Sequence, residues 1–255
     1  MSEHAPVCDK DSKQEEVDSE VVALRQELSQ LSESFQRFAY AVSHDMNAPV
    51  RSMAGFSGLL LKKYSQTLDD KGRQYLSFIV DGGEKLQAMM AGLLQYSRLN
   101  TASFTPVTVE SGKLAEECLG ALHEPLRESD AIVAIDPLPN MVGDADQLRQ
   151  LFQYLFENAL RFHKPDAHPQ IRVLAGTPQD NWTFCVADQG IGIDARFHKD
   201  IFLVFRKLHG DGEYPGVGMG LTLAKNIIER HHGRIWVESS PGEGARFFIR
   251  LPPSG

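Results

Sequence analysis

Two long series of apolar residues at heptad spacing constrain the fold of this chain more than any other feature. The first alternates steps of four and three residues, in the order Val17, Val21, Leu24, Leu28, Leu31, Phe35, Phe38 and Val42. After a polar break at residues 65–71, a second series follows with Tyr75, Ile79, Gly82, Leu86, Met89, Leu93 and Tyr96. This spacing places one apolar stripe along a helix and is typical of helical bundles. The two series predict an antiparallel helical hairpin.

One hairpin cannot bury a stripe of this length by itself. Because two hairpins that pair as a four-helix bundle cover both stripes, we expect a homodimer through residues 17–100. Two four-residue steps fall together between residues 38 and 46, and Pro49 follows them. Such a stutter unwinds a supercoil locally, and proline removes a backbone donor, so we expect a mechanically soft stretch of helix beside His44.

The rest of the chain has a different pattern. Residues 1–16 are polar and aperiodic and are expected to be a disordered lead, and residues 101–105 are expected to be a linker. Over residues 106–255, helical and strand patterns alternate, which predicts a mixed α/β layer domain. The expected helices are 113–127, 146–162 and 221–230, and the expected strands are 132–135, 170–174, 182–187, 234–238 and 246–251.

Charge and composition exclude several function classes. The net charge is -8 and Lys and Arg form no cluster, which argues against a nucleic-acid surface. No apolar run approaches the roughly 18 residues of a membrane-spanning helix, and the N-terminus lacks the apolar stretch of a signal peptide. Cys8, Cys118 and Cys185 have neither a disulfide pattern nor zinc-ligand spacing. The sequence therefore predicts a soluble, cytoplasmic protein.

Residues 43–49 carry the first candidate for chemistry. His44 lies two residues off the apolar stripe, so its imidazole is expected to face solvent, where it can act as a nucleophile. Asp45 can hold one ring nitrogen and leave the lone pair of the other nitrogen free. Taken alone, this pair is weak evidence, and a surface histidine on a charged helix is the favoured interpretation.

Three further clusters contain the residue types that hold nucleotides. Near the end of an amphipathic helix, Asn158 can supply an amide oxygen to magnesium, and Arg161 and Lys164 can meet phosphate oxygens. Asp188 ends a strand before a Gly-rich turn and can accept a hydrogen bond from an exocyclic amine such as that of adenine. Residues 216–221 alternate glycine into a helix N-terminus, which offers backbone amides to phosphates. Each cluster is weak alone, but their order along the chain is specific.

In that order, the sequence resembles the histidine protein kinases of two-component signalling, and in particular their bacteriophytochrome-type branch. The resemblance covers residues 34–251 and rests on the segments SHDMNAPVR, ENALRFHKPD, DQGIGID, IFLVFRKLH, YPGVGMGL and RIWVESSPGEGARFF. It implies that residues 17–100 form the dimerisation and histidine phosphotransfer domain. It also implies that residues 106–255 form an ATP-binding α/β sandwich of the GHKL (Bergerat) type.

The resemblance also implies roles for individual residues. His44 and Asp45 would be catalytic, Asn158 would hold Mg²⁺, and Phe202 would join Phe205 in anchoring a flexible lid. The implied ATP site consists of Asn158, Arg161, His163, Lys164, Asp188, Gly190, Gly192, Phe205, Lys207, Gly216, Gly218, Gly220 and Leu221. The expected activity is autophosphorylation of His44 by ATP, followed by transfer to an aspartate of a response regulator receiver domain.

Two residues depart from the family pattern. Ala48 stands where relatives often carry Thr or Asn for removing phosphate from the partner, and Tyr154 stands where relatives often carry a second Asn. The alternatives are a catalytically weak dimeric adaptor, which Tyr154 favours, and another GHKL ATPase such as a chaperone or topoisomerase, which gives His44 no role. No sensor-like segment precedes residue 17, so an upstream domain or a separate protein is expected to supply the stimulus.

Overall fold

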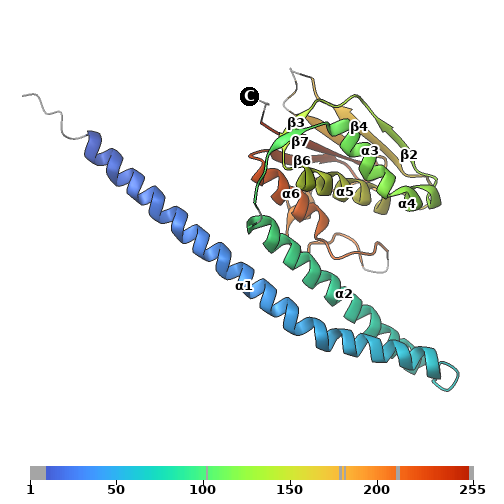
Figure 1. Cartoon of the computed structure of the whole chain (residues 1–255). Coiled ribbons are helices and arrows are strands. Elements are labelled where there is room, and N and C mark those ends of the chain that lie inside the picture. The colour runs from blue at the N-terminus through green and yellow to red at the C-terminus, as the bar shows by residue number, and fades with distance from the viewer. Residues whose placement is uncertain (1–9, 102, 178–179, 181, 211–212, 253–255) are drawn as a thin grey trace, which may run out of the picture.

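The computed structural model describes residues 10–101, 103–177, 180, 182–210 and 213–252. Helices α1 (Lys10–Tyr64) and α2 (Asp70–Thr101) form the predicted antiparallel hairpin, and α1 extends far beyond α2 (Figure 1). Residues 10–16 of the expected disordered lead are helical, and residues 1–9 lie outside the described residues. In the expected linker, α2 continues to Thr101, and residue 102 is not described.

Small side chains let the two helices of the hairpin approach closely. Ala39, Ser43 and Ala54 of α1 are buried, and a Cβ atom added at Gly83 of α2 would lie 2.7 Å from the Cβ of Ala54. The Ser43 hydroxyl donates to the backbone oxygen of Met90 at 3.4 Å. Pro49 lies inside α1, which is one continuous helix whose axis changes direction partway along (Figure 1).

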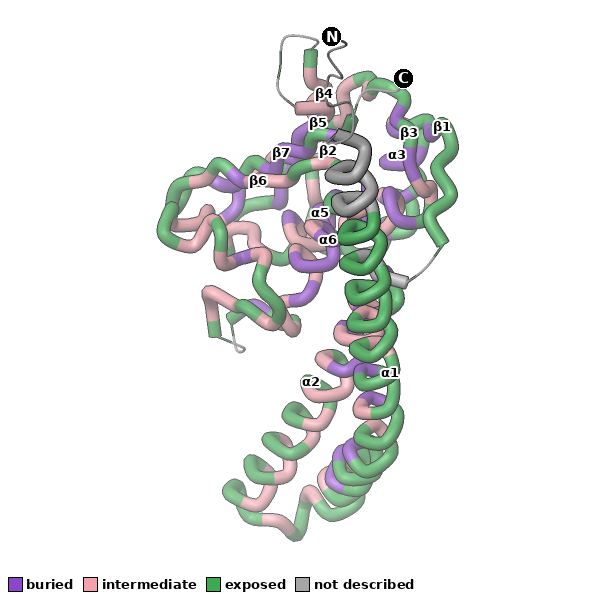
Figure 2. The backbone as a smooth tube through the Cα atoms, turned by 90° about the vertical axis from the view of Figure 1, so that its left-hand side faces the viewer, coloured by how far each residue is buried: buried purple, intermediate pink, exposed green. Residues whose placement is uncertain are grey.

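Little of the predicted apolar stripe of α1 packs against α2, although Phe35 meets the ring of Tyr96 edge-on, with 6.4 Å between ring centroids. In the single chain most of this stripe is exposed, and Figure 2 shows α1 as largely exposed. The exposed members include Val21, Leu24, Leu28, Leu31, Phe35 and Phe38. Apolar residues farther along α1 are exposed as well, namely Met46, Met53, Phe56 and Leu60. Within the described part of the chain, no helix combines the length and apolar character that a membrane span requires.

The α/β domain is built on a five-stranded sheet of order β2-β4-β5-β7-β6. Only the β2–β4 pair is parallel, and the other neighbours are antiparallel. A separate two-stranded ribbon pairs β1 with β3. The strands are β1 (Val107–Val109), β2 (Ile132–Ile135), β3 (Met141–Gly143), β4 (Gln170–Ala175), β5 (Phe184–Asp188), β6 (Arg234–Ser239) and β7 (Ala245–Arg250).

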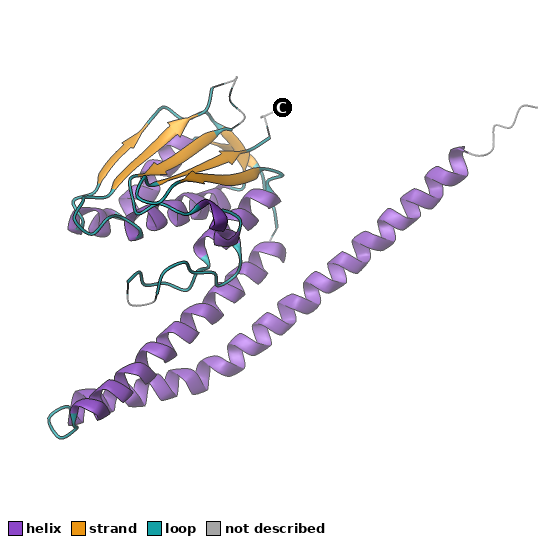
Figure 3. Cartoon of the chain, turned by 180° about the vertical axis from the view of Figure 1, so that it is seen from behind, coloured by secondary structure: helices purple, strands orange, loops and turns teal. Residues whose placement is uncertain are grey.

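Helices cover one face of this sheet (Figure 3). They are α3 (Ser111–Ala121), α4 (His123–Glu128), α5 (Ala145–Arg161) and α6 (Gly220–Arg230), with short 3-10 helices at Ala195–Phe197 and Asp200–Phe202. Asp144 caps α5 by accepting a hydrogen bond from the Gln147 backbone N–H at 3.1 Å. The aromatic rings of Phe152, Phe184 and Phe247 are fully buried between α5 and the sheet, which fixes α5 beneath the central strands.

The local pattern missed two features of this domain. The predicted helix 113–127 is divided into α3 and α4, and Pro125 lies in the first turn of α4, where proline costs no helical hydrogen bond. Strands β1 and β3 were not predicted, because three residues are too few to show an alternating pattern. Neither difference moves α5, β5 or α6, which carry the site.

Candidate active site

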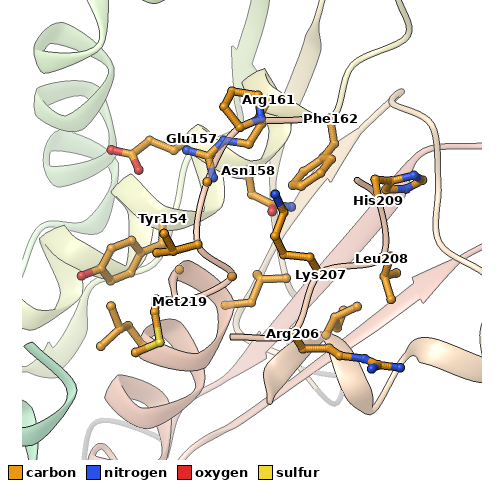
Figure 4. Close-up of a pocket in the computed structure, with 18 of the residues that line it drawn as sticks. Tyr154, Glu157, Asn158, Arg161, Phe162, Arg206, Lys207, Leu208, His209 and Met219 are labelled. Atoms are coloured by element: carbon orange, nitrogen blue, oxygen red, sulfur yellow. The ribbon is translucent and has the colours of Figure 1, made fainter. Parts of the chain in front are cut away.

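A cavity of about 420 Å³ lies between α5, α6, the end of β5 and the described residues of 203–219, which we call the lid loop. In Figure 4, Tyr154 and Met219 lie at one side of this pocket, and Lys207, Leu208 and His209 lie at the other. Helix α2 of the hairpin contributes a further wall. The pocket therefore combines residues from both halves of the chain.

Helix α5 presents four pocket residues on consecutive turns. They are Tyr154, Glu157, Asn158 and Arg161, which the i, i+3 and i+4 spacings place on one face. The amide oxygen of Asn158 is a hard ligand of the kind that Mg²⁺ prefers, so its place in the pocket fits a metal-bound nucleotide. A Cβ atom at Gly216 would lie 2.9 Å from Nη1 of Arg161, so the lid loop passes close to the guanidinium.

Asp188 is partly buried at the end of β5 and lines the pocket. Its Oδ1 accepts hydrogen bonds from the backbone N–H of Gly190 at 2.8 Å and of Ala245 at 3.1 Å. Burial raises the pKa of Asp188 to about 6, and the two backbone hydrogen bonds oppose part of that rise. Because both bonds reach Oδ1, Oδ2 is the oxygen that can serve a ligand amine.

The lid loop adopts conformations that depend on glycine. Gly216 has φ 137° and Gly218 has φ 72°, in the left-handed region that side chains rarely adopt. The loop leads into α6, whose first residues Gly220 and Leu221 line the pocket, so the N-terminal amides of this helix lie beside it. Lys207 also lines the pocket, and its Nζ donates to the Tyr214 backbone oxygen at 3.0 Å.

Most of the expected ATP-site residues line this one pocket. They are Asn158, Arg161, Asp188, Gly192, Lys207, Gly216, Gly218, Gly220 and Leu221. Four others lie beside it. His163 approaches the Leu160 backbone oxygen through Nδ1 at 2.7 Å, and Lys164 follows it in the loop after α5. The backbone of Gly190 holds Asp188, and Phe205 packs against the core of the domain.

The sequence did not predict the pocket residues of α2. They are Ala88, Ala91, Gly92 and Gln95, at spacings of three, one and three residues. Their spacing is helical, but small and polar residues between the heptad positions carry no local sign of a ligand. Only the packing of the α/β domain against α2 brings them to the site.

His44 lies in the hairpin, outside this pocket. Its side chain is 71% exposed, as predicted, and Nδ1 lies 3.0 Å from Oδ1 of Asp45. The imidazole stacks on the ring of Tyr40, with 6.0 Å between ring centroids. Among the described residues, none from α1 lines the pocket, so the exposed imidazole and the candidate nucleotide site are separate in this arrangement.

Comparison with known protein families identifies both halves of the chain. Residues 36–102 match the His Kinase A (phospho-acceptor) domain. Residues 143–255 match the family described as histidine kinase-, DNA gyrase B- and HSP90-like ATPase. The first match contains His44, and the second contains the whole pocket except the wall from α2.

Curated relatives include two phytochromes. Cyanobacterial phytochrome A of Nostoc sp. is 39% identical over 236 residues, which cover 92% of this chain and 31% of the relative. The phytochrome-like protein Cph1 of Synechocystis sp. is 34% identical over 233 residues, which cover 91% of this chain and 31% of the relative. The chain thus spans about a third of the length of these relatives.

Solved structures resemble the fold across both halves. Full-length ShkA in complex with AMPPNP aligns with a TM-score of 0.60 and 23% identity, covering 85% of this chain and 45% of ShkA. The Acinetobacter baumannii histidine kinase AdeS aligns with a TM-score of 0.58 and 17% identity, covering 83% of this chain and 98% of AdeS. At these identities the likeness concerns the fold of a helical hairpin followed by an α/β sandwich.

Proposed function

The chain belongs to the sensor histidine protein kinases, and on that premise we propose that it uses ATP to phosphorylate His44 and then passes the phosphoryl group to an aspartate of a response regulator receiver domain. The observation that carries the proposal is the pairing, in one chain, of an exposed imidazole held by a carboxylate with a glycine-lined pocket that contains Asn158 and Asp188. The imidazole would accept the phosphoryl group and the pocket would hold its donor, so the reaction needs both.

The geometry at His44 supports attack through Nε2. With Nδ1–H donating to Asp45, the Nε2 lone pair is free to attack the γ-phosphorus. A nitrogen–phosphorus bond forms, the bond from phosphorus to the β,γ-bridging oxygen breaks, and ADP leaves with that oxygen. The Asp45 carboxylate balances the positive charge that develops on the ring. Later, an aspartate oxygen of the partner attacks the same phosphorus and restores the imidazole.

Residues of the pocket would orient the nucleotide and screen its charge. Asp188 would accept a hydrogen bond from the adenine amine, and Arg161 and Lys207 would meet phosphate oxygens. Asn158 would hold Mg²⁺, which neutralises phosphate charge when bound. Since phosphoryl transfer asks mainly for alignment and charge neutralisation, these contacts are the chain's main contribution to the rate.

The exposed stripe of α1 supports a homodimer. A second hairpin would cover apolar side chains such as Leu28, Leu31 and Phe38, which one chain leaves open to water. We place the reaction in the cytoplasm, where ATP and reduced thiols coexist, in keeping with the free buried Cys118 and Cys185. An upstream sensor domain or protein would supply the stimulus through α1.

The decisive experiment is incubation of the His44→Gln variant with γ-labelled ATP. We expect the wild-type protein to take up acid-labile label and the variant to take up none, while both bind ATP equally well. His123→Gln, which removes an exposed histidine of the α/β domain, is the control and should label like the wild type. Label at the wild-type level in His44→Gln would refute the assignment, and binding of ATP without labelling of the wild type would favour an adaptor role.

A further inference from the structure

The wall that α2 contributes to the pocket ties the nucleotide site to the hairpin. Its residues are Ala88, Ala91, Gly92 and Gln95, and they lie on one face of α2. They face α5 and the start of α6, and no described residue of α1 joins them. In this arrangement α2 closes one side of the pocket, while the helix that carries His44 takes no part in its described lining.

Tyr154 of α5 contacts this wall of α2. The side-chain amide of Gln95 donates to the Tyr154 hydroxyl and also lies 3.3 Å from Oε1 of Gln150. Tyr154 stands one turn before Asn158 on the pocket face of α5, so its ring borders the metal-ligand candidate. Burial raises the pKa of Tyr154 to about 12, with Glu157 contributing, so the phenol stays neutral and keeps its proton at physiological pH.

A second contact ties the lid loop to the same face of α2. Met219, the residue before α6, is 4% exposed and packs against Gly92. A Cβ atom at Gly92 would lie 2.7 Å from Cγ of Met219, so the absence of a side chain at residue 92 makes room for the methionine. Both ends of the pocket, at α5 and at the lid loop, are thus held on α2.

We propose that Tyr154 is a positioning residue, whose hydroxyl latches the ATP-binding domain onto Gln95 of α2 and so holds the nucleotide away from His44 until the latch opens. The inference rests on the proposed phosphorylation of His44. While the latch is closed, α2 completes the pocket and favours nucleotide binding. Once it opens, the domain is free to swing toward α1, so the latch raises affinity for ATP at the expense of turnover.

Variants that remove only the latch test this proposal. Tyr154→Phe deletes the hydroxyl and keeps the ring, and Gln95→Leu removes the partner amide. For each we expect kcat for His44 phosphorylation to rise about two- to tenfold, the range for one neutral hydrogen bond, and KM for ATP to rise by a similar factor. The double variant should behave like either single variant, because both remove the same interaction. If Tyr154 and Gln95 had only a structural role, each single variant would lower kcat, and the effects of the two substitutions would add in the double variant.

Further variants check the mechanism and its independence from the chemistry. Gly92→Leu displaces Met219 and should raise kcat and KM, as the latch variants do. The control is Tyr75→Phe, which removes the hydroxyl of an exposed tyrosine of α2 and should change neither constant. Small-angle X-ray scattering without nucleotide should give a larger radius of gyration for Tyr154→Phe and Gln95→Leu than for the wild type.

Three outcomes are decisive. Unchanged kcat, KM and radius of gyration in Tyr154→Phe and Gln95→Leu would overturn the latch, and so would additive effects in the double variant. If the wild type took up no label, the proposed function would fail. The radius of gyration and the affinity for a fluorescent ATP analogue would then still decide whether Tyr154 holds the domain on α2.

Discussion

At the scale of single residues, the protonation of Asp188 decides what the pocket can recognise. Two backbone N–H groups occupy Oδ1, so a proton added to this carboxyl goes to Oδ2. Protonated Oδ2 is a donor and opposes the amine donor of adenine. Because burial raises the pKa of Asp188 to about 6, this change falls within an accessible pH range.

We therefore predict that ATP binds more weakly as the pH falls through about 6. Asp188→Asn should bind ATP about tenfold or more weakly at pH near 7, since a hydrogen bond to a charged group contributes about 1.5–3 kcal/mol. Its affinity should show only the pH dependence of the nucleotide itself. Calorimetric titration of both proteins at about pH 5.5 and about pH 7.5 measures this difference.

The effect of Asp188 on the free energy of unfolding has a different pH dependence from its effect on ATP binding, so the two can be measured apart. A carboxyl whose pKa is raised stabilises the folded state below its unfolded value of 3.8, and this contribution is lost as the pH rises through about 6. Asp188→Asn therefore should not reduce the free energy of unfolding near pH 7. Asp166→Asn, in an exposed loop, is the control. Equal pH profiles for wild type and Asp188→Asn would contradict the assignment.

At the scale of elements, the lid loop depends on glycine at particular positions. Gly218 has φ 72°, and a Cβ atom there would lie 2.6 Å from the backbone oxygen of Arg206. An L-residue in the left-handed region costs about 1–2 kcal/mol, and the close contact adds to this. The loop can relieve that strain only by changing its backbone conformation, which disturbs the pocket lining that residues 206–209 and 215–219 provide.

We predict that Gly218→Ala weakens ATP binding by about tenfold while the α/β domain stays folded, since a local strain of this size is smaller than the stability of a typical domain. Binding of a fluorescent nucleotide and urea unfolding measure the two effects. Gly210→Ala is the matched control in the same loop, because its added Cβ meets nothing within 4 Å. If both variants lost the same affinity for the nucleotide, the loss would come from alanine anywhere in the loop and not from the backbone conformation at Gly218.

The sequence predicted the elements that have a periodic apolar pattern and missed those that are too short to show one. Long heptad series predicted both hairpin helices, and an amphipathic pattern predicted α5, whereas its cap at Asp144 was not predicted. The short ribbon of β1 with β3 has no period to detect. His231, the C-cap of α6, is buried, and its Nε2 accepts a hydrogen bond from the Asp144 backbone N–H at 3.0 Å. That contact joins residues far apart in the chain.

At the scale of the whole molecule, the order of motifs predicted the site better than its surroundings. Asn158, Asp188 and the lid glycines are local patterns, and the fold brings them to one pocket. The wall from Gly92 and Gln95 depends on how the α/β domain packs against α2, which no local pattern encodes. Whether the exposed stripe of α1 becomes buried likewise depends on a partner outside the single chain.

That stripe leads to a prediction about assembly. Leu28 and Leu31 are 66% and 67% exposed in the single chain, although burying a leucine side chain contributes roughly 1.5–3 kcal/mol. If a second α1 covers them, Leu28→Glu combined with Leu31→Glu places four carboxylates in the seam and should halve the mass measured by sedimentation equilibrium. Ser29→Glu with Gln30→Glu adds the same charge off the seam and should leave the dimer intact. A wild-type protein that sediments as a single chain would mean that no second α1 covers this stripe, and a seam variant that dimerises as tightly as the Ser29→Glu, Gln30→Glu control would place Leu28 and Leu31 outside the interface.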